Sequence, residues 1–243
     1  MTWSSQKIDT VSDMSSLGPL GPAVLADRAY QAIKHAILSL ELEPGSRLVE
    51  RRLAEQFHIS KSPVRDALHR LAGEGLVIQT PYAGVVVRRF SPDFVDELYE
   101  LREVLEGMAV QLAVPRLTEA DAAEAEASFQ AAEAAMRAND NAGRGEAADR
   151  FHAILYRTAG NRPLQTALRG FSDQVRIISA VNWQLRDTRW ESHRQHQAIM
   201  AAAVAGDAET ASERMREHIR RGRIEYRTAT EAQAEDSLVP AEP

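Results

Sequence analysis

The sequence contains no cysteine among its 243 residues. This absence excludes disulfide bonds, thiolate metal ligands and cysteine nucleophiles, and it fits a reducing compartment. Long apolar runs are also missing, because the nearest candidate, residues 199–206, is mostly alanine and much shorter than the roughly 20 residues that cross a bilayer. The amino terminus lacks the basic start and apolar core of a secretory signal. We therefore expect a cytoplasmic protein without a membrane partner.

Positive charge is in the minority, since 29 Lys and Arg stand against 35 Asp and Glu, a net charge of −6. The charge is unevenly distributed, however. Residues 24–90 hold ten Lys and Arg against seven Asp and Glu, a balance of +3, whereas residues 91–243 hold eighteen against twenty-six, a balance of −8. Phosphate contacts are local, so a basic amino-terminal module on an acidic body can still bind DNA.

The length of the chain suits two compact units with flexible ends. Residues 1–22 are rich in Ser, Gly and Pro without periodicity, and residues 229–243 are also polar and aperiodic, so a disordered arm and a disordered tail are expected. Between them the helix period dominates. The pattern predicts a mainly α protein with one domain over 23–90 and a second over 91–228.

The first domain has the pattern of a winged helix-turn-helix. Its predicted second and third helices are separated by a short break over 58–61, which is the length of a helix-turn-helix turn. Two β-branched runs, Leu76–Gln79 and Val85–Arg88, flank a Pro/Gly turn and predict a small β-hairpin that would form the wing. The predicted helices span 24–39, 50–57 and 62–74.

Two stretches of this domain closely resemble the winged helix-turn-helix of the GntR family. They are residues 40–57, which include LEPGSRLVERRLAEQF, and residues 59–77, ISKSPVRDALHRLAGEGLV. The resemblance implies that this unit binds double-stranded DNA. The family usually has Arg where this chain has Lys61, and Lys keeps the charge but loses the bidentate fork. The positions that the resemblance assigns to DNA contacts are Arg51, Lys61, Ser62, Arg65 and Gly84.

The second domain is predicted to be an antiparallel bundle of six to seven helices. Within it, His196 and His218 lie ten and eleven residues from a predicted helix-hairpin turn at 206–207, so the two rings should lie at nearly the same height. Asp149 and His152 are three residues apart and share one helix face. Three imidazoles and a carboxylate suit a divalent metal of the Zn, Ni or Mn class. The alternative is that each His is an ordinary surface or core residue.

Ser91 is expected to cap a helix that starts near Pro92, and Thr118 with Asp121 resembles a capping box. The predicted helices span about 93–114, 118–139, 144–159, 162–185, 190–205 and 208–228.

This domain resembles the FadR carboxy-terminal domain of the GntR family, through LYELREVLE over 98–106, DRFH over 149–152 and AGN over 159–161, followed by the two later His residues. The resemblance implies metal ligation by Asp149, His152, His196 and His218. Metal-binding members usually carry the aspartate four positions before the first His, and that position is Ala148 here. His193 is a possible substitute ligand.

Arg102 is the predicted partner of an acidic effector, because a guanidinium holds a carboxylate through two hydrogen bonds. The alternative is a salt bridge to Glu106 at i+4. Together these features predict a homodimeric repressor, not an enzyme, that binds a short near-palindromic operator and responds to a small carboxylate beside its metal. Two alternatives are a regulator in which the metal itself is the effector and a metal-dependent hydrolase.

Overall fold

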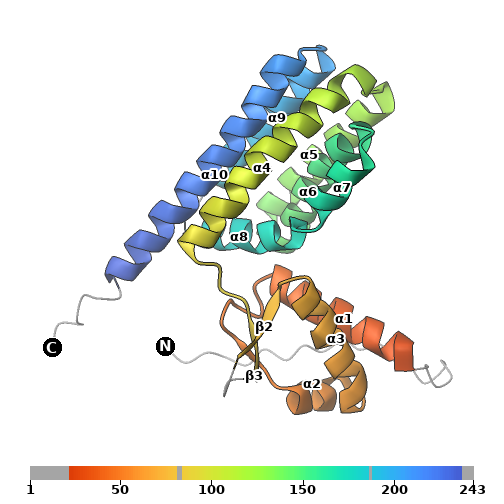
Figure 1. The fold of residues 1–243 in the computed structure, drawn as a ribbon, viewed down its shortest axis with the longest axis vertical. Coiled ribbons are helices and arrows are strands. Elements are labelled where there is room, and N and C mark those ends of the chain that lie inside the picture. Colours follow the sequence, from red (N-terminus) through yellow and green to blue (C-terminus); the bar gives the residue numbers. More distant parts are fainter. Residues whose placement is uncertain (1–21, 81–83, 186–187, 237–243) are drawn as a thin grey trace.

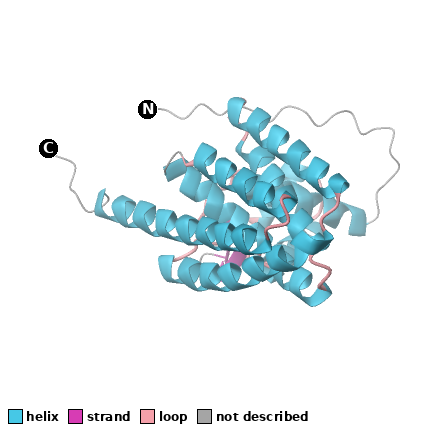
Figure 2. Cartoon of the chain, turned by 90° about the horizontal axis from the view of Figure 1, so that it is seen from above, coloured by secondary structure: helices cyan, strands magenta, loops and turns pink. Residues whose placement is uncertain are grey.

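The computed structural model describes residues 22–80, 84–185 and 188–236. Figure 1 shows a small amino-terminal unit below a longer bundle of helices. Figure 2, viewed from above, shows that helices make up nearly all of the molecule and that the strands occupy one small region. This arrangement confirms the predicted mainly α fold with an amino-terminal winged helix-turn-helix.

The amino-terminal unit packs three helices against a small antiparallel sheet with strand order β1-β3-β2. Ile33 and Ile37 of α1 lie with Leu68 and Leu71 of α3 in its core, and all four side chains are almost fully buried. The helix-turn-helix turn follows His58, which ends the second helix in the left-handed region at φ 53°. The elements are α1 Pro22–Leu38, β1 Arg47–Leu48, α2 Glu50–Phe57, α3 Lys61–Gly73, β2 Val77–Thr80 and β3 Gly84–Val87.

The carboxy-terminal part is a bundle that contains, within the described residues, seven α-helices. The predicted start of α4 is correct, since the Ser91 hydroxyl accepts a hydrogen bond from the Phe94 amide and Pro92 is the first helical residue. α4 and α10 run antiparallel side by side along the bundle (Figure 1). The elements are α4 Pro92–Ala113, the short 3-10 helix η1 Val114–Arg116, α5 Glu119–Arg137, α6 Asn141–Thr158, α7 Arg162–Arg169, α8 Ser172–Leu185, α9 Arg189–Val204 and α10 Ala208–Asp236.

Three expectations from the sequence need correction. The strand β1 is not foreseen, and the single helix expected over 162–185 is two helices, α7 and α8, that meet near Gly170. The last helix continues through Asp236, so residues 229–236 are helical and not a disordered tail. Ala229, the first residue of this stretch, is buried.

Parts of the expected arm, wing turn and tail fall on residues 1–21, 81–83 and 237–243, which lie outside the described residues. Pro22, the last residue of the expected arm, begins α1. In the part of the chain that is described, no helix combines the length and apolar character needed to cross a membrane.

Candidate functional site

The exposed face of α3 carries the side chains predicted to contact DNA. Val64, Ala67 and Leu68 are buried, so the opposite face of the helix points to solvent. Ser60 occupies the N-cap position, but its side chain makes no capping hydrogen bond. The amide groups of the first turn can therefore meet a phosphate oxygen. The exposed residues at this end of the helix are Lys61, Ser62 and Arg65.

Two of the cations predicted to contact DNA, Arg65 of α3 and Arg51 of α2, are held by carboxylates of α2. The Arg65 guanidinium donates from Nε to Oε1 of Glu50 at 3.1 Å and from Nη2 to Oε2 at 2.9 Å. This paired contact holds the pKa of the Glu50 carboxyl below its usual range. Arg51 lies 3.3 Å from Glu55 in an exposed i,i+4 pair. Both pairs are exposed, so phosphates can compete with the carboxylates at little cost.

In the wing, β3 begins at Gly84, which has φ +75°. A Cβ added to this residue would have no heavy atom within 4 Å. The backbone there is open to solvent and adopts a conformation that favours glycine. Its carbonyl accepts a hydrogen bond from the Thr80 hydroxyl at 3.2 Å, which ties the two strands together at their ends. This position suits a close backbone approach to DNA.

The three predicted His residues converge inside the bundle, from α6, α9 and α10. The Nε2 atom of His196 lies 3.2 Å from Nε2 of His152 and 3.1 Å from Nε2 of His218. An ion with metal–nitrogen bonds of about 2.0–2.1 Å places neighbouring ligand atoms roughly 3.0–3.4 Å apart. The ring nitrogens are therefore spaced as ligands of one ion, and the ligand atoms of all three lie within 4.8 Å of one another.

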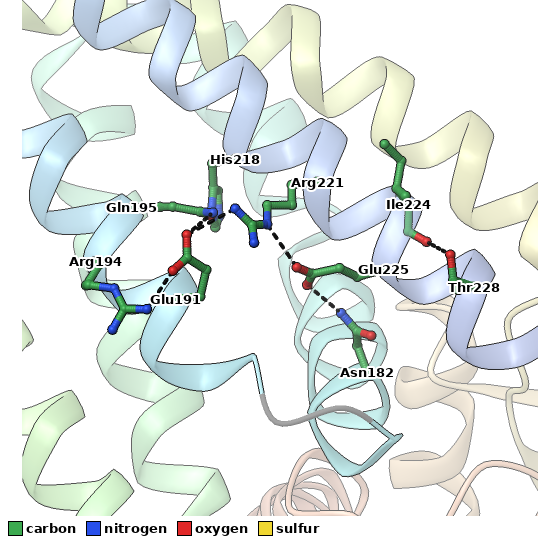
Figure 3. A network of polar contacts seen from close by, with 9 residues as sticks. All are labelled: Asn182, Glu191, Arg194, Gln195, His218, Arg221, Ile224, Glu225 and Thr228. Carbon is green, nitrogen blue, oxygen red and sulfur yellow. Dashed lines mark hydrogen bonds and ion pairs between the residues drawn. The ribbon is translucent and has the colours of Figure 1, made fainter. Parts of the chain in front are cut away.

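Each outer ring has an oxygen beside its Nδ1 atom. Nδ1 of His218 lies 2.7 Å from Oε1 of Gln195 (Figure 3), and Nδ1 of His152 lies 2.8 Å from Oε2 of Glu106, a close contact without the geometry of a regular hydrogen bond. With a proton on each Nδ1, both Nε2 atoms present a lone pair toward His196. A single imidazole N–H can satisfy only one of them. A cation between the three rings satisfies all three.

Burial favours the neutral, metal-binding form of two of these rings. It lowers the pKa of His218 to about 3, with further lowering by the neighbouring His152 and Arg102. Burial and the adjacent His218 also hold the pKa of His196 well below its usual range. Both imidazoles are therefore neutral at pH 7.

A cavity of about 170 Å³ lies beside the three His residues. This space can hold several waters or a small organic molecule. Its wall includes Arg102, whose Nε donates to Oε1 of the fully buried Glu106 at 2.7 Å, and Arg176, whose Nε lies 3.0 Å from Oδ2 of Asp149. The cavity thus presents two guanidinium groups, each already beside a carboxylate of the protein.

The helices around this cavity are linked by a polar network (Figure 3). Arg221 of α10 donates to Glu191 of α9 at 3.0 Å and to Glu225 of its own helix at 3.1 Å. Asn182 of α8 donates to the other oxygen of Glu225 at 3.4 Å. Three helices that line the cavity are therefore linked through Arg221 and Glu225.

Comparison with known proteins identifies both parts of the chain. Residues 25–87 match the family described as bacterial regulatory proteins, gntR family, and residues 97–221 match the FCD domain, a FadR carboxy-terminal-like domain. The chain belongs to the GntR family. The regulators of this family bind double-stranded DNA and generally act as dimers. The family and the relatives are transcriptional regulators and not enzymes, which removes the hydrolase alternative.

Individual GntR relatives agree with this identification. The Nta operon transcriptional regulator of Aminobacter aminovorans is 30% identical over 171 residues, which are 68% of this chain and 78% of the relative. The solved structure of Escherichia coli McbR/YncC matches with a TM-score of 0.71 and 25% identity over 84% of this chain and 98% of that one. A GntR regulator from Rhodococcus sp. RHA1 has the same fold, with a TM-score of 0.73 and 22% identity over 84% of this chain and 98% of that one.

The structure of this GntR regulator separates the predicted site residues. It brings together His152, His196 and His218, but the Asp149 carboxylate lies on Arg176 and is not a member of the group. His193 lies 3.2 Å from Glu133 and is not a member either.

For four residues of the site, the prediction from the sequence was incomplete. Arg102 makes the salt bridge to Glu106 that was the alternative to effector binding, and Glu106 itself was not foreseen as a partner of His152. Gln195 and Arg176 were missed, because a single amide or guanidinium on a helix has no spacing pattern to reveal it.

Proposed function

We propose that this GntR regulator is a cytoplasmic repressor that binds a short near-palindromic operator as a homodimer and responds to a small organic acid held beside a divalent metal ion. The observation that carries the effector part is the convergence of three imidazole nitrogens beside a cavity with two guanidinium groups. The DNA part is supported by the family and by the exposed amino-terminal end of α3.

On DNA, the two recognition helices of the dimer would enter successive major grooves. Lys61 and Arg65 reach phosphates or a guanine edge, and Ser62 donates to a phosphate. Arg51 adds a phosphate contact from the start of α2, and Gly84 lets the wing backbone approach the minor groove.

In the effector domain, His152, His196 and His218 would hold a metal of the Zn, Ni or Mn class. When bound, the metal is a Lewis acid with open positions for a carboxylate oxygen. Gln195 would hold His218 in the required tautomer, and Glu106, 2.8 Å from Nδ1 of His152, would favour the same tautomer of that ring. Arg102 would share its guanidinium between Glu106 and the effector carboxylate. Ligation by Asp149 as well stays a prediction, and its contact with Arg176 does not favour it.

Metal binding is tested by calorimetric titration of the apoprotein with Zn²⁺ and by elemental analysis. The H196A variant should bind Zn²⁺ at least about 100-fold more weakly, since loss of a second-shell partner alone costs about 10- to 100-fold. The matched control is H193A, which removes an imidazole one turn away on the same helix and should bind like wild type. Equal affinities of H196A and wild type would contradict the proposed site.

The effector is tested by titrating the operator complex with small carboxylates at saturating Zn²⁺. A change of operator affinity with one carboxylate class, lost in an Arg102→Met variant, supports the proposal. A response to Zn²⁺ alone, with no carboxylate changing it further, would overturn the organic-acid part and favour the metal as the effector.

A further inference from the structure

Helix α8 has two functional faces. Six of its residues, spaced at three- and four-residue intervals, line the cavity beside the His residues. Two others, Asp173 and Gln174, contact the amino-terminal unit. In Figure 1 α8 lies at the end of the bundle closest to that unit. The cavity-lining residues of α8 are Ser172, Val175, Arg176, Ser179, Asn182 and Trp183.

The contacts of α8 with the amino-terminal unit converge on the end of the recognition helix. Glu74, the C-cap residue of α3, accepts a hydrogen bond on its backbone carbonyl from the Gln174 amide at 3.0 Å. Lys34 of α1 lies 2.6 Å from the Asp173 carboxylate and 3.1 Å from that of Glu74. The Tyr30 hydroxyl donates to the same Glu74 carboxylate at 2.6 Å. We call Lys34, Glu74, Asp173 and Gln174 the α8 latch.

The latch is closely packed and not a loose surface pair. The side chains of Lys34 and Asp173 are only 19% and 26% exposed. A Cβ added to Gly75, directly after the recognition helix, would lie 2.7 Å from the Gln174 amide nitrogen. Gly75 also has φ +72°, where glycine is favoured. The close approach therefore depends on a glycine at the junction.

The turn of α8 that carries Asp173 and Gln174 also carries Arg176, which forms an ion pair in the cavity. Arg176 follows Asp173 by three residues and Gln174 by two, so these side chains lie within one turn. The Arg176 guanidinium lies 3.0 Å from the Asp149 carboxylate inside the cavity. A carboxylate entering the cavity meets a guanidinium whose present partner is another carboxylate.

We propose that α8 is the coupling element of this regulator: a carboxylate that takes Arg176 from Asp149 moves α8, and this movement opens the latch on the recognition helix. The effector step rests on the proposed function, whereas the mechanical link between Arg176 and the latch does not. The coupling requires only that the ligand bind the open-latch state more tightly than the closed one.

The latch is tested by measuring the distance between the two domains with spin labels. The chain has no cysteine, so Q56C on α2 and A127C on α5, both at exposed positions, provide two unique label sites. Unlabelled protein in excess keeps one labelled chain per dimer. The wild-type background should give a narrow distance distribution, and the D173N–Q174A background a shifted or broadened one.

The matched control is D27N, which breaks an Asp–Arg ion pair within the amino-terminal unit and should leave the distribution narrow. An unchanged distribution in D173N–Q174A would overturn the latch.

The link to the cavity is tested with R176M in both backgrounds. With an intact latch, R176M should shift the distribution although the ion-pair partner of Arg176 is Asp149 and not a latch residue. With D173N–Q174A already present, R176M should add no further shift. R176M leaves the Asp149 carboxylate without its partner, which could destabilise the protein. A second variant, D149N–R176M, removes that carboxylate and should give the same shift. No shift from either variant, or an equal shift in both backgrounds, would overturn the proposal.

The corresponding effect on operator affinity is expected to be about twofold to thirtyfold, the range for substitutions in coupling networks. Because the distance measurement needs neither metal nor DNA, it can fail while Zn²⁺ and operator binding succeed, and it can succeed while they fail. The two proposals are therefore distinguishable.

Discussion

At the scale of the residue, Arg65 is the side chain on which DNA affinity should depend most. Glu50 holds it in the free protein. R65A should weaken operator binding by about 5- to 150-fold, the value of one bidentate base contact. E50Q should tighten binding a fewfold, because it removes a carboxylate that phosphates must displace.

Fluorescence anisotropy at a series of salt concentrations measures the operator affinity of both variants. In the same series, K61A should reduce the slope of log affinity against log salt by about 1 if Lys61 contacts a phosphate. Weaker binding by E50Q would contradict the competition between Glu50 and DNA.

Asp149 gives a second test at this scale. If the three His residues are the protein ligands, D149N should bind Zn²⁺ within a fewfold of wild type, since its carboxylate lies on Arg176. Isothermal titration of D149N beside H152A makes the comparison. A loss as large as that of H152A would restore Asp149 as a ligand.

Part of this metal site could be predicted from the sequence and part could not. The His residues could be aligned from the sequence because a tight hairpin fixes the relative height of α9 and α10 and because His152 shares a helix with a recognisable motif. The partner of Asp149 could not be predicted, because it depends on how α8 packs against α6, which no local pattern encodes.

At the scale of the element, the caps of the helices were the most predictable features. Thr118 and Asp121 form the expected capping box of α5: the Asp121 amide donates to the Thr118 hydroxyl at 3.2 Å, and the Thr118 amide donates to the Asp121 carboxylate at 3.0 Å. The helix over 229–236 could not be foreseen, because the sequence there is polar and aperiodic, although Ala229 is buried. β1 could not be foreseen either, because a two-residue strand depends on the partner that it finds in β3.

The capping box should make α5 sensitive to acid. Hydrogen bonds from Thr118, with a smaller contribution from Arg157, lower the pKa of Asp121 from 3.8 to about 2. A folded pKa below the unfolded one stabilises the protein above about pH 4, and this stabilisation is lost as the pH falls toward 2.

D121N should therefore cost about 1 kcal/mol of unfolding free energy at pH 7 and progressively less at lower pH. Urea unfolding at pH 7, 4 and 2.5 measures the difference, with D27N as a surface control. A difference between D121N and wild type that stays constant over this range would contradict the role of the box.

At the scale of the whole molecule, α4 exposes a line of large apolar side chains, Leu101, Val104 and Met108, which are 48%, 65% and 45% exposed. They lie at i, i+3 and i+7 on the face opposite the core. Since GntR regulators generally act as dimers, a second copy of this chain is the expected partner of this face.

V104E–M108E should therefore shift the protein from dimer to monomer in light scattering coupled to size-exclusion chromatography. V204E, on an exposed valine of α9, is the matched control and should remain dimeric. A dimeric V104E–M108E protein would place the interface elsewhere.

The most direct measurement of DNA recognition is the affinity of the purified protein for an operator selected from random duplexes, compared with an unselected duplex of the same length and salt. We expect the operator to bind at least about 10³-fold more tightly, to contain two half-sites about 10 base pairs apart, and to lose most of this preference with K61A–R65A. Equal affinities for the two duplexes would contradict a sequence-specific regulator.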